Sequence, residues 1–167
     1  MRSFVPFALI VSLFTAAPSP AAAPAVVPPT TWTWPVLGPV IQPFDPPEDP
    51  YGSGHRGIDI AAPVATSIVA PADGLVTFAG PVGGRLFLTI DHGGGLESTY
   101  SWLTSVLVRK GDVVVRGQPI ALTGWGHPNA PIPHLHFGVK LNDVYADPLA
   151  YLEPAPIGGL IRLAPLA

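Results

Sequence analysis

The sequence contains no cysteine. This absence excludes disulfides, thiol catalysis and cysteine-based zinc fingers. It is compatible with export, because a chain without thiols is indifferent to the redox state outside the cell. Charge is also scarce: 11% of the 167 residues are charged, the formal net charge is −3, and no basic run exists. Nucleic acid is therefore a poor candidate as a partner. The length suits one domain with its own core.

Long apolar runs are missing as well. The stretch from Phe4 to Ala17 contains Pro6 and is too short for a comfortable membrane span. With Arg2 ahead of it and small residues behind, it is typical of a secretory signal, which we place at residues 1–25. An uncleaved membrane anchor is the alternative. We therefore expect an extracytoplasmic protein with no stable membrane span once the signal is removed.

Proline is concentrated where regular structure is absent. Eleven of the 23 prolines lie between residues 18 and 50, which argues against helix or central strand there. We assign residues 26–33 to a proline-rich linker, residues 34–152 to the folded domain and residues 153–167 to a C-terminal tail without an assigned role. The sequence does not indicate an oligomeric state.

Beyond residue 60 the sequence consists of short apolar runs separated by Gly, Pro and Asp, without convincing helical periodicity. Runs of this length and spacing predict an antiparallel all-β domain. The expected strands cover residues 67–70, 74–79, 86–91, 97–102, 113–115, 118–123 and 134–141.

Two histidines, His134 and His136, stand one residue apart in an apolar and aromatic context. Side chains at positions i and i+2 of a strand leave the same face, so both imidazoles would project together while Leu135 and Phe137 enter the core. A shared metal ion is the commonest reason to direct two imidazoles at one point. A pair of surface histidines on an edge strand is the plainer alternative.

A second cluster holds His55 and Asp59. Alternation places both on one face of a strand, with Ile58 and Ile60 on the other. On a straight strand their Cα atoms would lie about 13 Å apart, so we expect a bend, which Gly57 permits. With one of the two later histidines they would form a three-ligand zinc site with an open fourth position, as in catalytic zinc centres.

These segments resemble the lysostaphin/LytM-type metallopeptidases, the M23 family. The resemblance rests on GHRGIDIA at residues 54–61 and PHLHF at residues 133–137, and it extends to residues 70–76, 90–96 and 108–117. It covers roughly residues 34–152. The two-part pattern, His-x-x-x-Asp followed by His-x-His, is specific in this order and at this distance. The resemblance implies a single antiparallel β-sheet domain with long loops around a groove.

The resemblance also implies roles for individual residues. His55, Asp59 and His136 match the zinc ligands of the family, and His134 matches a catalytic histidine beside the metal. The implied activity is that of a secreted zinc metalloendopeptidase, associated with the bacterial cell wall. Its substrates would be peptide bonds in the stems or cross-bridges of peptidoglycan. Bound zinc would polarise the scissile carbonyl, and a histidine would assist the proton transfers.

One departure from the family pattern concerns Trp102. The family carries a second catalytic histidine in a Tyr-x-His-Leu motif, and Trp102 occupies that position after Tyr100. An indole N–H can donate a hydrogen bond but cannot exchange a proton near neutral pH. His127 or His92 could substitute for the missing group. The alternative function is a non-catalytic or attenuated module that binds peptidoglycan or activates another cell-wall hydrolase.

Overall fold

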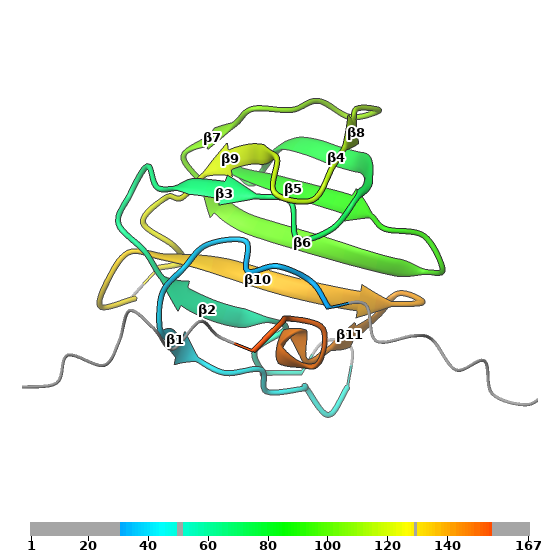
Figure 1. The fold of residues 1–167 in the computed structure, drawn as a ribbon. Helices are drawn as coiled ribbons and strands as arrows, with labels where there is room; N and C mark the ends of the chain where they lie inside the picture. Colours follow the sequence, from blue (N-terminus) through cyan, green and yellow to red (C-terminus); the bar gives the residue numbers. More distant parts are fainter. Residues whose placement is uncertain (1–30, 50–51, 129, 155–167) are drawn as a thin grey trace, which may run out of the picture.

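The computed structural model describes residues 31–49, 52–128 and 130–154. Its main element is an eight-stranded sheet in which all strand pairs are antiparallel (Figure 1). The strand order is β1-β2-β10-β6-β5-β4-β8, with β11 paired to β10. The strands are β1 Val40–Gln42, β2 Ile58–Ala61, β4 Gly74–Val82, β5 Arg85–Asp91, β6 Leu96–Leu103, β8 Val113–Val114, β10 His134–Leu141 and β11 Val144–Ala146.

A second, three-stranded antiparallel sheet has the order β3-β9-β7. Its strands are β3 Ser67–Val69, β9 Pro119–Leu122 and β7 Ser105–Val106. The one helical element of the described residues is a 3₁₀ turn, η1, at Pro148–Ala150. Within the described parts of the chain, no helix is long and apolar enough to cross a membrane. The all-β prediction is confirmed, and the small second sheet adds to it.

Strand β10 lies inside the large sheet, between β2 and β6. Its apolar residues alternate with other residues, so that one face of the strand can enter the core. Leu135, Phe137 and Val139 have no exposed surface and lie in the core. On one side β10 pairs with β2, and on the other it pairs with β6, where the ring of Tyr100 lies 5.4 Å from that of Phe137. The residues between the apolar positions, His134 and His136, therefore lie on the opposite face of the sheet.

The structure contains three strands that the sequence patterns do not predict: β1, β7 and β11. Each has only two or three residues, so no alternation separates it from the turns around it; β3 and β8 are as short, but they lie within the predicted apolar runs 67–70 and 113–115. Strand β1 lies in the proline-rich part, but it is an edge strand that pairs only with β2, a position where proline neighbours are tolerated. The seven predicted strands are present with shifts at their ends.

The N-terminal side of the described chain is tied to its C-terminal side. The Trp32 backbone N–H donates to the Tyr151 carbonyl at 2.8 Å, and the Glu153 N–H donates to the Trp32 carbonyl at 2.8 Å. The Trp32 side chain is only 1% exposed and packs against His92 and Phe137. The predicted boundary between linker and domain (33/34) and the predicted boundary between domain and tail (152/153) both lie within this paired region. The buried indole of Trp32 attaches the end of the predicted linker to the core. The predicted signal peptide lies outside the described residues, as does the tail from residue 155 onward.

Candidate metal centre

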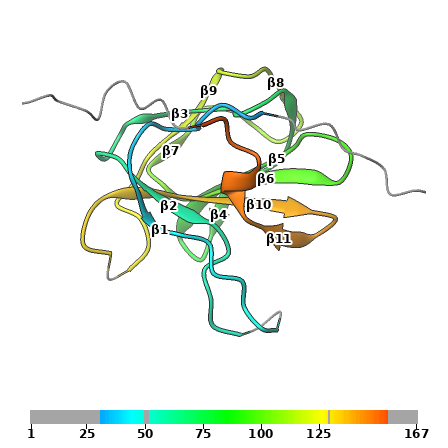
Figure 2. The same ribbon diagram turned by 60° about the horizontal axis from the view of Figure 1, so that its bottom comes forward.

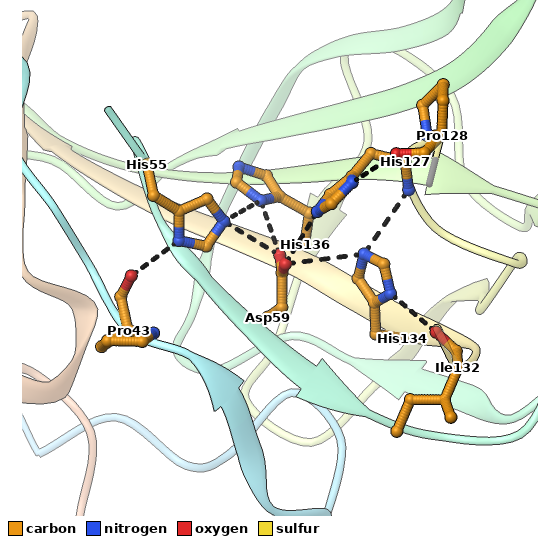
Figure 3. A network of polar contacts seen from close by, with 8 residues as sticks. All are labelled: Pro43, His55, Asp59, His127, Pro128, Ile132, His134 and His136. Atoms are coloured by element: carbon orange, nitrogen blue, oxygen red, sulfur yellow. Dashed lines mark hydrogen bonds and ion pairs between the residues drawn. The ribbon is translucent and has the colours of Figure 1, made fainter. Parts of the chain in front are cut away.

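The pairing of β2 with β10 brings Asp59 and the two neighbouring histidines together. His136 stands directly opposite Asp59 in the antiparallel ladder, and His134 stands opposite Ala61. Directly opposed residues share a face of the sheet, so the Asp59 carboxylate meets both imidazoles on the face away from the core. The His136 Nδ1 lies 2.9 Å from Asp59 Oδ1, and the His134 Nε2 lies 3.7 Å from Asp59 Oδ2 (Figure 3).

His55 reaches the same carboxylate because the chain bends just ahead of β2. Residues 56 and 57 form the bend, and His55 is held in an isolated bridge with Asp45. A Cβ on Gly57 would overlap the carbonyl oxygen of Phe137, so only glycine permits this approach to β10. The bend places His55 Nε2 3.1 Å from both Asp59 Oδ1 and His136 Nδ1. Figure 2 shows the described parts of the β1–β2 connection reaching away from the sheet.

A fourth histidine, His127, joins the cluster from the loop that precedes β10. Its Nε2 lies 2.9 Å from Asp59 Oδ2, on the side of the carboxylate away from His55 and His136. Its ring centroid lies 4.6 Å from that of His134. The sequence indicated His127 only as a weak substitute for a missing group, because a loop carries no periodicity that would fix where its side chains point. Its position just before His-x-His was the available signal.

Asp59 is the centre of the cluster, with four imidazoles around one carboxylate. It is only 1% exposed, and its burial would by itself raise the pKa of the carboxyl. The hydrogen bonds with His136 and His127, together with the charges of His136 and His55, outweigh burial and lower the pKa to about 2. Asp59 is therefore ionised at neutral pH, as a metal ligand must be.

The hydrogen bonds of His55 fix which ring nitrogen faces Asp59. The Nδ1–H of His55 donates to the carbonyl oxygen of Pro43 at 2.7 Å, so in the neutral ring that binds a metal the lone pair is on Nε2. That lone pair points at Asp59 Oδ1 and His136 Nδ1, which are themselves 2.9 Å apart. Metal-binding histidines commonly donate the other ring N–H to a carbonyl in this way.

The three converging atoms fit a zinc ion. Three ligand atoms at 2.9–3.1 Å from one another lie near the separation of about 3.3 Å that tetrahedral zinc imposes with bonds of about 2.0–2.1 Å. His55 and Asp59 also form a second possible ligand set with His127, whose three ligand atoms lie within 4.8 Å of one another. The set with His136 is tighter, and we consider it the primary one.

His134 is the completely buried member of the cluster. Its Nδ1–H donates to the Ile132 carbonyl at 3.0 Å, so its Nε2 carries the lone pair and accepts the His127 backbone N–H at 3.4 Å. Gly126 makes this contact possible: its φ is +97°, and a Cβ there would overlap the His134 imidazole. His134 therefore lies beside the carboxylate but farther from it than the other three histidines.

Trp102, which occupies the position of the missing histidine, and His92, a possible substitute for it, contact residues outside the cluster. Trp102 has a φ of +62° at a bulge in β6, and its ring packs against Phe87 and beneath the guanidinium of Arg85. His92 donates through Nδ1 to the Asp73 carbonyl at 2.7 Å and accepts the hydroxyl of Ser98 at 2.7 Å. His92 thus belongs to a polar network that continues through Ser98 to the hydroxyl of Tyr100, and its two hydrogen bonds go to Asp73 and Ser98 and not to the cluster.

A known protein family matches the segment that contains the cluster. Residues 53–148 match the sequence model of Peptidase family M23, which is more than half of the chain. The chain belongs to this family. The match includes all of the clustered histidines and Asp59.

Two solved structures share the fold. A zinc-containing peptidase from Vibrio cholerae is 29% identical with a TM-score of 0.62, over 75% of this chain and 41% of that one. The catalytic domain of lysostaphin from Staphylococcus simulans is 25% identical with a TM-score of 0.55, over 64% of this chain and 86% of that one. The predicted lysostaphin/LytM-type fold is confirmed.

One curated relative is named as an activator and not as a peptidase: the murein hydrolase activator NlpD of Escherichia coli. It is 35% identical over 125 residues, which is 74% of this chain and 31% of that protein. The chain spans 59% of the length of other curated relatives that it matches.

Proposed function

We propose that this chain is an extracytoplasmic zinc metalloendopeptidase that hydrolyses peptide bonds in bacterial peptidoglycan. The observation that carries the proposal is the convergence of His55, Asp59 and His136. Their three ligand atoms lie 2.9–3.1 Å apart, and hydrogen bonding leaves the His55 lone pair directed at the other two. Membership of the peptidase family and the likeness to a zinc-containing peptidase support zinc as the metal.

In this proposal the residues have separate tasks. His55, Asp59 and His136 would hold the ion, and bound zinc would supply Lewis acidity toward a carbonyl and toward water. His134 presents the lone pair of Nε2 on the Oδ2 side of Asp59, 3.7 Å from the oxygen. It is the group that would take up and return a proton during hydrolysis. Pro43 fixes the tautomer of His55 through its carbonyl.

The likeness to lysostaphin, an antimicrobial peptidase, and to a murein hydrolase activator supports the cell wall as the place of action. Peptide stems and cross-bridges are the bonds in peptidoglycan that a peptidase could cut. The predicted secretory signal at residues 1–25 agrees with this location, because such a substrate lies outside the cytoplasm.

A non-catalytic module that binds peptidoglycan or activates another hydrolase is the second candidate. Trp102 favours it, because its indole stands where the family has a second catalytic histidine and packs on Phe87 and Arg85. The loss of a proton-transfer group lowers a rate by about 10²–10⁴-fold. The curated name of NlpD as an activator also favours it.

Digestion of purified sacculi by the zinc-loaded protein tests both candidates. Mass spectrometry of the released fragments should find new amino termini at one peptide linkage, and a chelator or the variant His136→Ala should abolish them. Intact sacculi with the protein bound, for wild type and variant alike, would support the activator. Metal analysis should find about one zinc per chain, and none at neutral pH would refute the site.

A further inference from the structure

We propose that His127 is a fourth protein ligand of the metal centre, so that the resting site is closed by the protein itself. The inference rests on the proposed zinc site and concerns the position that a catalytic site leaves open. It is carried by the loop between β9 and β10, which lies beside the end of β2 (Figure 1). Two different groups of this loop contact the cluster.

The first contact is made by the His127 side chain. Its Nε2 lies 2.9 Å from Asp59 Oδ2, and the ligand atoms of His127, His55 and Asp59 lie within 4.8 Å of one another. Binding of one ion by all of them requires a small inward movement of His127. The side chain has room for this movement, because it is 30% exposed, whereas Asp59 is almost fully enclosed.

The His127 ring is oriented in the same way as that of His55. Its Nδ1 lies 3.2 Å from the carbonyl oxygen of Pro128, which can only accept, so Nδ1 carries a proton and donates it. The other nitrogen, Nε2, faces the carboxylate (Figure 3). A ring nitrogen bonded to a carbonyl with its opposite nitrogen directed at the ion is the usual arrangement of a metal-binding histidine.

The second contact is made by the backbone of the loop. The His127 N–H donates to His134 Nε2 at 3.4 Å, the nitrogen to which we assign proton transfer. Gly126 lets the loop approach so closely, because any side chain there would meet the His134 ring. One short segment thus engages both the open coordination position and the lone pair of His134. A substrate would have to displace residues 126 and 127 before it reached either.

Cadmium-113 bound to protein with ¹⁵N-labelled histidine provides a direct count of the imidazole ligands. One-bond couplings between cadmium and nitrogen should appear for His55, His136 and His127 in the wild type. The variant His127→Ala should lose one of them and keep the other two. Trp125→Ala is the matched control: it removes a side chain that is 59% exposed from the same loop, and it should keep all three couplings.

Cobalt-substituted protein gives a second readout that does not depend on cleavage. Azide should leave the visible absorption spectrum of the wild type unchanged and should shift that of His127→Ala, because only the variant has a position for an external ligand. Couplings to His55 and His136 alone in the wild type would overturn this inference and leave the proposed function intact. Failure of the wild type to bind cadmium would overturn both this inference and the proposed metal site. Sacculus digestion tests the proposed function independently of the number of histidine ligands.

Discussion

The replacement Asp59→Asn tests whether the carboxylate at the centre of the cluster has the electrostatic role that its contacts indicate. The pKa of Asp59 falls from 3.8 to about 2 because hydrogen bonds from His136 and His127 outweigh its burial. Such a shift stabilises the folded, metal-free protein by about 2 kcal/mol at neutral pH. Asparagine has the shape of the protonated carboxyl group, so the variant should lose this amount.

The pH dependence follows from the direction of the shift. Because the folded pKa is lower than the unfolded one, the stabilisation is complete above the unfolded value and is lost as the pH falls toward about 2. The difference between wild type and Asp59→Asn should therefore shrink to about half by pH 3. Urea unfolding of chelator-treated protein at both pH values measures it.

Zinc and a control variant complete the experiment. Zinc at 100 times its dissociation constant should stabilise the wild type by about 2.7 kcal/mol, and it should stabilise Asp59→Asn hardly at all. Asp143→Asn, in the exposed turn between β10 and β11, should behave as wild type. An equal loss of stability for Asp59→Asn at pH 7 and pH 3 would refute the electrostatic reasoning and leave only a loss of packing.

Three further predictions concern other parts of the molecule. Trp102→His should increase sacculus cleavage by about 10²-fold or more if the missing proton-transfer group limits the rate; an equal increase in Trp102→Phe would contradict this. Gly126→Ala should lower the free energy of unfolding by more than Gly111→Ala, because Gly111 has a similar φ of +94° but open space where a Cβ would lie. Backbone strain alone accounts for about 1–3 kcal/mol in each variant. Equal losses by urea unfolding would rule out the overlap with His134. Burial lowers the pKa of His92 below 6.5 despite the hydrogen bond to the Asp73 carbonyl, so the contribution of the neutral ring to stability is present above pH 6.5 and is lost as the pH falls. The stability advantage of wild type over His92→Gln should therefore decrease between pH 7 and pH 5. A constant difference would count against a buried, neutral His92.

Much of the fold could be predicted because its strands alternate clearly. In β10 every second residue is apolar, so the sequence predicts both the strand and the face on which His134 and His136 lie. The bend that brings His55 to Asp59 also followed from the sequence, since a straight strand could not place both on one ion. The assignment of these four residues to separate roles stays a prediction.

The contributions of the loop and the N-terminal segment could not be predicted. His127 stands among glycines and prolines, where no periodicity indicates the direction of a side chain, and its contact with Asp59 spans 68 residues of sequence. Trp32 lies in the proline-rich segment, where the sequence does not decide whether the side chain enters the core, and its indole is buried against the core. Both positions depend on tertiary contacts that a local pattern does not contain.

The register between β2 and β10 links the assembly of the cluster to the burial of the core. His136 faces Asp59 only in the register that also places Leu135 and Phe137 in the core. A slip by one residue would turn both histidines inward and both apolar side chains outward, which would lose about 3–6 kcal/mol of apolar burial together with the metal ligands. The burial of Leu135 and Phe137 therefore selects the same register that assembles the cluster, and the ligands need no separate device to align them.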